Sequence, residues 1–235
     1  MKSKRILLDD LALTIQWKRV KNVNLVVSSP DGRVRVSAPL GYSEEMIRTI
    51  VAAKQPWIMK KRAAIQGRTV LSPPSLMANG EPVAVFGRPF PLVITEKRGA
   101  ATMRLVDDRL ELEVRPAMSA ALRREVLNRW YRQQLQLRIP ALLSRYQTLI
   151  GVEVLEWRIR QMKTRWGSCN VRDRRIWLNL VLARLAPVFL EYVLVHELVH
   201  LLEKSHNGRF QRLMDRFFPR WRQVRAQLKQ ISLLL

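Results

Sequence analysis

One short segment constrains the fold and the chemistry of this chain more than any other. It holds all three histidines of the protein and begins with an HExxH pattern, His196-Glu197-Leu-Val-His200. On a helix, residues four positions apart lie on one face, one turn apart, so the imidazoles of His196 and His200 can bind the same zinc ion. We therefore expect a helix here that faces a metal and water.

His206 is the natural third ligand, because zinc in catalytic sites commonly takes three protein ligands and leaves a position for water. Five residues separate it from His200, too many for one face of a continuous helix, so a turn between Glu203 and Ser205 is predicted. Glu197 lies beside the first ligand, where its carboxylate can act as general base toward a zinc-activated water. Glu203 as a ligand of the thermolysin type stays open as an alternative, although its offset from His200 differs from that pattern.

The residues around the motif favour helices. Pro187 suits the first turn of a helix, and apolar side chains recur along the stretch that follows it. We predict this helix from Pro187 to about Lys204. A final helix, capped by Asn207, is predicted to extend to Leu228.

Short strand-like patterns dominate the first part of the chain. An antiparallel meander is expected at the start, with its last two strands joined at Pro30-Asp31-Gly32. A helix near 43–62 follows and kinks or restarts at Pro56. More strands are expected after the turn-rich stretch 71–75. The strands predicted in this part of the chain are 11–17, 24–28, 33–37, 83–86, 91–95, 103–106 and 110–114.

The character of the chain changes after Pro116. Residues 120–150 are rich in Leu, Arg and Gln and predict a helix with a bend near Pro140. Two short strands are expected beyond it, around 152–160 and 175–180.

These patterns together predict an α+β fold. A β-rich N-terminal domain with one helix is expected over residues 1–115, and a second domain that holds the histidines over residues 116–235.

The formal net charge is +23, from 42 basic and 19 acidic residues, and it predicts attraction to polyanions such as nucleic acid. A basic face that is simply solvated explains the same charge and stays open. The only cysteine, Cys169, has no partner for a disulfide, and the basic first residues lack the apolar core of a signal peptide. Both observations predict a cytoplasmic protein. The most apolar window, Val188 to Leu202, contains four ionisable residues, which predicts no membrane span.

Several stretches resemble one family, the YgjP-like metallopeptidases, which are relatives of the SprT-like and Wss1-like zincins. The most distinctive stretch is Arg165-Trp-Gly-Ser-Cys169, because HExxH alone occurs in many unrelated lineages. The similarity covers most of the chain. The matching stretches are 162–169, 176–180, 191–200 and 206–210.

The resemblance implies a zincin-like metallopeptidase domain, with the HExxH helix beside a small sheet, that follows a β-rich domain. It also implies one zinc ion per chain, bound by His196, His200 and His206, with Glu197 as the catalytic residue and a peptide or protein as substrate. SprT-type relatives are associated with proteolysis of proteins crosslinked to DNA, which suits the basic charge.

Three residues are candidates for contacts with the substrate or its oxyanion: Arg165, Trp166 and Tyr192, the last one turn before the first ligand. An alternative stays open, in which Trp166 does not contact the substrate but helps to shape a tight turn. The strand at 175–180 is a candidate to pair with an extended substrate. Cys169 is interpreted as a small buried or loop residue, since no second group supports it as a ligand.

The sequence therefore predicts a zinc-dependent hydrolase, with peptide bonds as the expected target. Two alternatives remain open at this point: a basic nucleic-acid-binding protein with a structural or idle zinc site, and a zinc hydrolase of a non-peptide bond.

Overall fold

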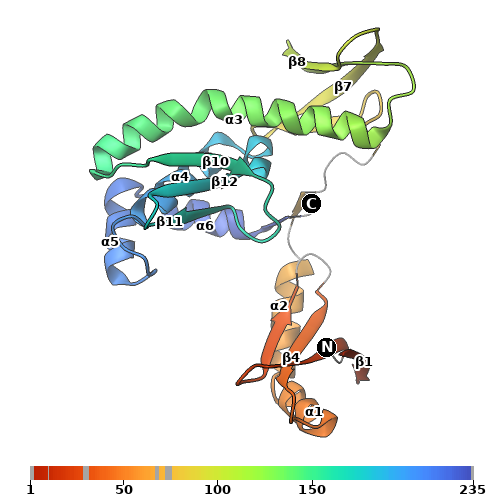
Figure 1. Cartoon of the computed structure of the whole chain (residues 1–235), viewed down its shortest axis with the longest axis vertical. Coiled ribbons are helices and arrows are strands. Elements are labelled where there is room, and N and C mark those ends of the chain that lie inside the picture. Colours follow the sequence, from red (N-terminus) through yellow and green to blue (C-terminus); the bar gives the residue numbers. More distant parts are fainter. Residues whose placement is uncertain (1–2, 10, 29–31, 67–68, 72–75, 234–235) are drawn as a thin grey trace. The chain divides into compact units, whose positions relative to one another are not determined.

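A computed structural model of the chain describes residues 3–9, 11–28, 32–66, 69–71 and 76–233. The chain forms two compact units, Met1–Leu71 with Lys229–Leu234, and Ser72–Leu228 with Leu235 (Figure 1). Within the described ranges, no helix is both long and apolar enough to cross a membrane. The expected α+β class is confirmed, since each unit combines helices with small sheets.

The first unit is built on a four-stranded sheet in the order β1-β2-β4-β3. β2 and β4 pair in parallel, while the two outer pairs are antiparallel. The predicted antiparallel meander is therefore wrong, because β4 inserts between β2 and β3 instead of following at the edge. The elements of this unit are β1 (Ser3–Leu8), β2 (Leu11–Lys18), β3 (Asn24–Val27), β4 (Val34–Pro39), α1 (Glu44–Ala53), α2 (Gln55–Gln66), β5 (Thr69–Leu71) and β13 (Ile231–Leu233).

Alternating residues of the central strands form the core of the first unit. One face of β2 and β4 packs against Ile47 and Val51 of α1 and Ile58 of α2. α1 ends at Ala53 and α2 begins at Gln55, which confirms the predicted restart beside Pro56. Of the predicted turns, Pro30, Asp31 and residues 72–75 lie outside the described residues. The buried strand residues are Leu11, Leu13, Ile15, Trp17, Val34, Val36 and Ala38.

The second unit contains two further sheets and four α-helices among its described residues. One sheet has the order β6-β7-β9-β8, and the other has the order β10-β12-β11. The elements are β6 (Pro82–Val85), β7 (Arg88–Glu96), β8 (Thr102–Val106), β9 (Arg109–Val114), α3 (Ala120–Ile150), β10 (Glu156–Arg160), β11 (Gly167–Asn170), β12 (Arg175–Asn179), the 3-10 helix η1 (Leu180–Arg184), α4 (Pro187–Val199), α5 (Gly208–Phe217) and α6 (Trp221–Lys229).

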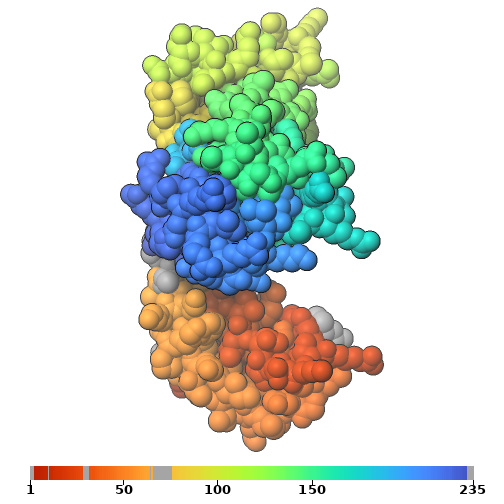
Figure 2. All heavy atoms as spheres, turned by 90° about the vertical axis from the view of Figure 1, so that its left-hand side faces the viewer, coloured from red at the N-terminus to blue at the C-terminus, as the bar shows by residue number. Residues whose placement is uncertain are grey.

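The long helix α3 is continuous through Pro140 and organises this unit. Ser119 caps its first turn, and Gly151, with φ of 76°, ends it in the left-handed conformation that glycine adopts without strain. α3 contacts α4 and η1. In Figure 2 the green surface that includes α3 adjoins the blue surface of the C-terminal part of this unit.

The sheet that contains β6 and β7 belongs to the second unit. At its β6–β7 turn, the backbone N–H of Phe86 donates to the carbonyl of Ala183 (2.8 Å) and that of Gly87 to Arg184 (3.1 Å). Tyr131 of α3 donates its hydroxyl to the carbonyl of Ala84 at 2.6 Å. These bonds join β6 to η1 and α3. Accordingly, the chain divides into its two compact units after Leu71, whereas the change in composition lies at residue 115.

The C-terminal helices are shorter than the sequence patterns indicate. α4 ends at Val199 and is followed by a turn, in which the N–H groups of Leu201 and Leu202 donate to carbonyls three residues back. The predicted last helix is divided into α5 and α6 around Pro219, a residue that cannot donate a backbone hydrogen bond.

Candidate metal centre

The centre is built on α4, a helix that is buried on nearly all sides. It contacts α3, η1, β11 and β12, and most of its apolar side chains are buried. Two polar residues of α4 lie among these apolar side chains: His196 is partly buried, and Glu197 is only 5% exposed. A buried carboxylate is costly unless a partner compensates for it, and a nearby cation would do so.

The three histidines converge on one point. The ring centroids of His196 and His200 lie 4.8 Å apart, those of His200 and His206 4.8 Å, and those of His196 and His206 5.0 Å. One nitrogen of each ring lies within 4.8 Å of the others, and the Nε2 atoms of His196 and His206 are 3.0 Å apart. Within the described part of the chain, this cluster contains no carboxylate.

A short turn after α4 brings His206 back to the helix. The carboxylate of Glu203 accepts a hydrogen bond from the N–H of Ser205 (3.1 Å), and the side chain of Asn207 caps α5 by accepting from Phe210 N–H (3.1 Å). The ring of Phe210 then packs against all three imidazoles at 4.8 to 5.0 Å. The carboxylate of Glu203 is thus engaged within the turn. The contact of Glu203 with the histidines is through its backbone carbonyl, which faces His200.

The protonation of the imidazoles suits metal binding. Burial and the neighbouring imidazoles lower the pKa of His196 to about 3, so its ring is neutral at neutral pH. Nδ1 of His200 lies 3.0 Å from the carbonyl of Glu203, which favours a proton on Nδ1 and leaves Nε2 with a free lone pair. Nδ1 of His196 is buried without a hydrogen-bond partner among the described residues. Three convergent imidazole nitrogens are a donor set that zinc accepts.

Glu197 and β11 are in direct contact. A Cβ atom at Gly167 would lie 2.7 Å from Oε1 of Glu197 and 2.8 Å from Cγ1 of Val193, so only glycine lets the strand approach this closely. Burial raises the pKa of Glu197 to about 8, and the charge of Arg165 opposes that shift. The carboxylate therefore lies in a site that excludes water on the β11 side.

Asn179 holds the loop before β11. Its amide donates to the carbonyls of Met162 (2.8 Å) and Arg165 (2.7 Å), and its oxygen accepts from Val181 N–H (3.2 Å). Its own N–H donates to the carbonyl of Trp166 at 2.9 Å. The side chain is fully buried, so this amide fixes the loop that carries Arg165.

A cleft of about 720 Å³ opens above the histidines. Its lining includes Arg165 but neither Trp166 nor Tyr192. Tyr192 is buried, with its ring 5.8 Å from that of His196 and 6.1 Å from that of Phe218. The lining residues are Arg165, Gly167, Ser168, Cys169, Asn170, Val171, Arg172, His196, Glu197, His200, Lys204 and His206.

The strand that borders the cleft is β11, which the sequence patterns did not reveal. The predicted partner strand around 175–180 is β12, whose two edges are already paired with β10 and β11. It therefore cannot accept an extended substrate, whereas β11 is an edge strand of this sheet.

Two further residues of this region had sequence signals that were not interpreted as functional. Asn179 is a lone polar residue in an apolar run, and Gly167 lies in the distinctive Arg165–Cys169 stretch. Cys169 lines the cleft, but burial and the charge of Glu197 raise the pKa of its thiol to about 12. A protonated thiol is a poor metal ligand and a poor nucleophile.

Comparison of the chain with known proteins finds a matching family and similar solved structures. The family model described as "YgjP-like, metallopeptidase domain" matches residues 21–231. Two crystal structures of metallopeptidase zymogens are similar to part of the chain. Abylysin from Pyrococcus abyssi is 25% identical, over 41% of this chain and 99% of that one, with a TM-score of 0.36. Jannalysin from Methanocaldococcus jannaschii is 21% identical, over 39% and 94%, also with a TM-score of 0.36. No curated protein matches.

Proposed function

The chain belongs to the YgjP-like family of metallopeptidases, and from this premise we propose that it hydrolyses peptide bonds with one zinc ion bound by His196, His200 and His206. Glu197 is the general base in this proposal. The observation that carries it is the convergence of three imidazoles beside a buried carboxylate in an open cleft.

The chemistry divides between the metal and the protein. When bound, zinc supplies Lewis-acid polarisation of a carbonyl and lowers the pKa of water to roughly 7. Glu197 accepts a proton from the attacking water as it adds to the peptide carbonyl, and then donates this proton to the leaving amine nitrogen. The contact with Gly167 holds the carboxylate in place for both transfers.

Arg165 is the side chain that we propose for the oxyanion. It is exposed and lines the cleft, its charge acts on Glu197, and its backbone is anchored by Asn179. A guanidinium in this position can donate hydrogen bonds to the negative charge that develops on the substrate oxygen. Tyr192 is less suited, since it is buried and does not line the cleft.

The proposed substrate is an extended peptide or protein segment along the free edge of β11. An edge strand offers backbone N–H and C=O groups that pair with such a segment whatever its side chains. This arrangement places the segment beside the histidines and Glu197, since β11 contacts α4.

Two further features of the proposal rest on composition. A cytoplasmic site of action fits a chain whose single cysteine has no partner for a disulfide. Association with nucleic acid is supported by the net charge of +23.

The test compares the parent with Glu197→Gln, in zinc content and in hydrolysis of an unstructured protein. We expect the variant to retain zinc while kcat falls by about 10² to 10⁴-fold, the usual contribution of a general base. Glu191→Gln is the matched control, since Glu191 also lies on α4 but bonds to Tyr146 outside the cleft. Equal activity of parent and Glu197→Gln would refute the mechanism.

The same assay separates the alternatives. A parent that binds zinc and DNA, yet releases no peptide, would favour the nucleic-acid-binding alternative. Cleavage of a non-peptide ester but of no peptide would identify a hydrolase of another bond.

A further inference from the structure

The cleft has an excess of positive charge. Three of its lining residues, Arg165, Arg172 and Lys204, are exposed cations. The only carboxylate in the lining is Glu197, which is 5% exposed and is assigned to proton transfer. A molecule that enters the cleft therefore meets cations at its walls.

Among the residues that the structure describes, these cations lack a close counter-charge, although the charge of Arg165 acts on the buried Glu197. Across the described residues, none of the three forms an ion pair. The acids next to two of them in sequence are engaged elsewhere. Asp173 pairs with Arg175 at 3.1 Å, and Glu203 accepts from the N–H of Ser205 at 3.1 Å. Positive charge without counter-charge in a concave site attracts anions.

The cations flank the strand that would hold the substrate. Arg165 lies two residues before β11, Arg172 lies two residues after it, and Lys204 follows α4 in the turn that leads to His206. A strand rises about 3.3 Å per residue, so the four residues of β11 span roughly 10 Å. An extended peptide on β11 therefore passes a cation at each end of the strand.

We propose that the cleft selects peptide segments with Asp or Glu side chains on both sides of the scissile bond. The inference rests on the proposed peptidase function and names its substrate class. Arg172 contacts an acidic side chain at one end of β11, and Lys204 contacts another from the turn after α4. Arg165, at the other end of β11, is kept for the oxyanion and adds its charge to the attraction. Exposed ion pairs are individually weak, so two of them, each giving about threefold, together give a preference of about tenfold.

The test uses three fluorogenic peptides that differ only in the residues flanking one scissile bond: Glu, Gln or Lys. The parent should cleave the Glu peptide with a kcat/KM about tenfold above that of the Gln peptide, and the Lys peptide more slowly still. In 1 M salt the preference should shrink to about twofold, because the screening length falls to roughly 3 Å.

Variants then assign the preference to the cleft. Arg172→Gln and Lys204→Gln should each lower the Glu-to-Gln ratio of kcat/KM by about threefold. Arg174→Gln is the matched control: Arg174 is also exposed and near β11, but it pairs with Glu153 at 2.9 Å and does not line the cleft. It should keep the parent's ratio.

The outcomes distinguish the inference from the function on which it rests. Equal cleavage of all three peptides, with loss of cleavage in Glu197→Gln, would overturn the acidic preference and leave the peptidase intact. If the parent cleaved none of the three peptides and did not cleave an unstructured protein, both the acidic preference and the peptidase function would be overturned. An equal fall in the ratio for Arg174→Gln and Arg172→Gln would show that general charge, and not the cleft, causes the preference.

Discussion

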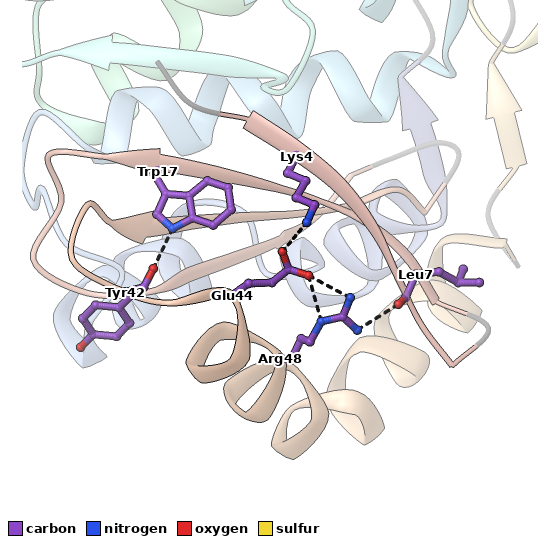
Figure 3. A network of polar contacts seen from close by, with 6 residues as sticks. All are labelled: Lys4, Leu7, Trp17, Tyr42, Glu44 and Arg48. Carbon is purple, nitrogen blue, oxygen red and sulfur yellow. Dashed lines mark hydrogen bonds and ion pairs between the residues drawn. The ribbon is translucent and has the colours of Figure 1, made fainter.

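The core of the first unit and the metal centre bury different kinds of side chain. In the first unit, the buried cluster is apolar, and the polar contacts lie nearer the surface. Lys4 and Arg48 both bond to the carboxylate of Glu44, and Arg48 also donates to the carbonyl of Leu7 (Figure 3). In the second unit, the buried side chains include Glu197, which lines the cleft, and Asn179, which bonds to the backbone of Arg165.

The difference shows what each region is built to do. Apolar burial is non-directional and tolerates small shifts, and exposed ion pairs contribute only about 0.2 to 1 kcal/mol each. Buried polar groups are costly unless each has its partner, so their geometry is exacting. Changes near the proposed metal site should therefore damage the proposed hydrolysis more than folding, and changes in the first unit should do the reverse.

The largest effect on hydrolysis is expected from His206→Ala. It removes the proposed ligand that comes from the turn well beyond the end of α4, so zinc affinity should fall by more than about 100-fold, beyond the 10 to 100-fold that loss of a ligand's supporting partner costs. Competition with a chromophoric chelator measures this affinity. Ser205→Ala, in the same turn, is the control and should bind zinc normally; unchanged affinity in His206→Ala would remove this residue from the ligand set.

Gly167→Ala should come next. The added methyl group would meet Oε1 of Glu197 at 2.7 Å, so either the carboxylate or β11 must move. A displacement of about 1 Å at a reacting group costs on the order of 100-fold in rate. Steady-state kinetics on one peptide, with zinc content measured in parallel, checks this. Ser168→Ala lies on the same strand and should have a small effect; parent-like kcat in Gly167→Ala would contradict the close packing.

Asn179→Asp tests the buried amide that positions the Arg165 loop. The change keeps the shape but replaces a donor of two hydrogen bonds by an acceptor that faces two carbonyls. We expect the free energy of unfolding to fall by about 1 to 3 kcal/mol and kcat by about tenfold, as Arg165 loses its fixed position. Urea denaturation measures the stability, and steady-state kinetics measure kcat. If stability fell as expected while kcat stayed like that of the parent, the role of Asn179 would be purely structural.

Ile15→Ala should have the smallest effect on hydrolysis. It tests the comparison in the first unit, where a change should affect stability and not catalysis. Ile15 is fully buried in the first unit, and truncation of such a residue costs about 2 to 5 kcal/mol through lost burial and a cavity. Protection of β2 amides in hydrogen exchange should fall, while kcat stays within about twofold of the parent. A large loss of kcat at full zinc occupancy would show that the first unit takes part in catalysis.

Local patterns predicted the elements that depend on neighbouring residues. The alternation in β2, the restart of the helix at Pro56 and the helical placement of His196 follow from backbone geometry over a few positions. Pro219 favours a break between α5 and α6, because a proline inside a helical pattern ends or kinks the helix. The prediction of a single helix did not take this residue into account.

Contacts between distant residues were beyond those patterns. The parallel pairing of β2 with β4 and the edge position of β11 are choices among several registers that the same alternation permits. The role of Asn179 depends on a loop that begins 17 residues earlier. A polar residue in an apolar run indicates only that some partner exists, and not which one.

The sequence by itself determined the residues on which the proposed chemistry of the centre rests: two imidazoles one helical turn apart, a carboxylate beside the first and a turn that can return His206. These follow from residue type and short-range spacing. Only the tertiary structure decided which strand borders the cleft, which cations line it and why Gly167 must be glycine. Those features depend on where β11 packs against α4, and that packing is set by the free energy of the whole fold.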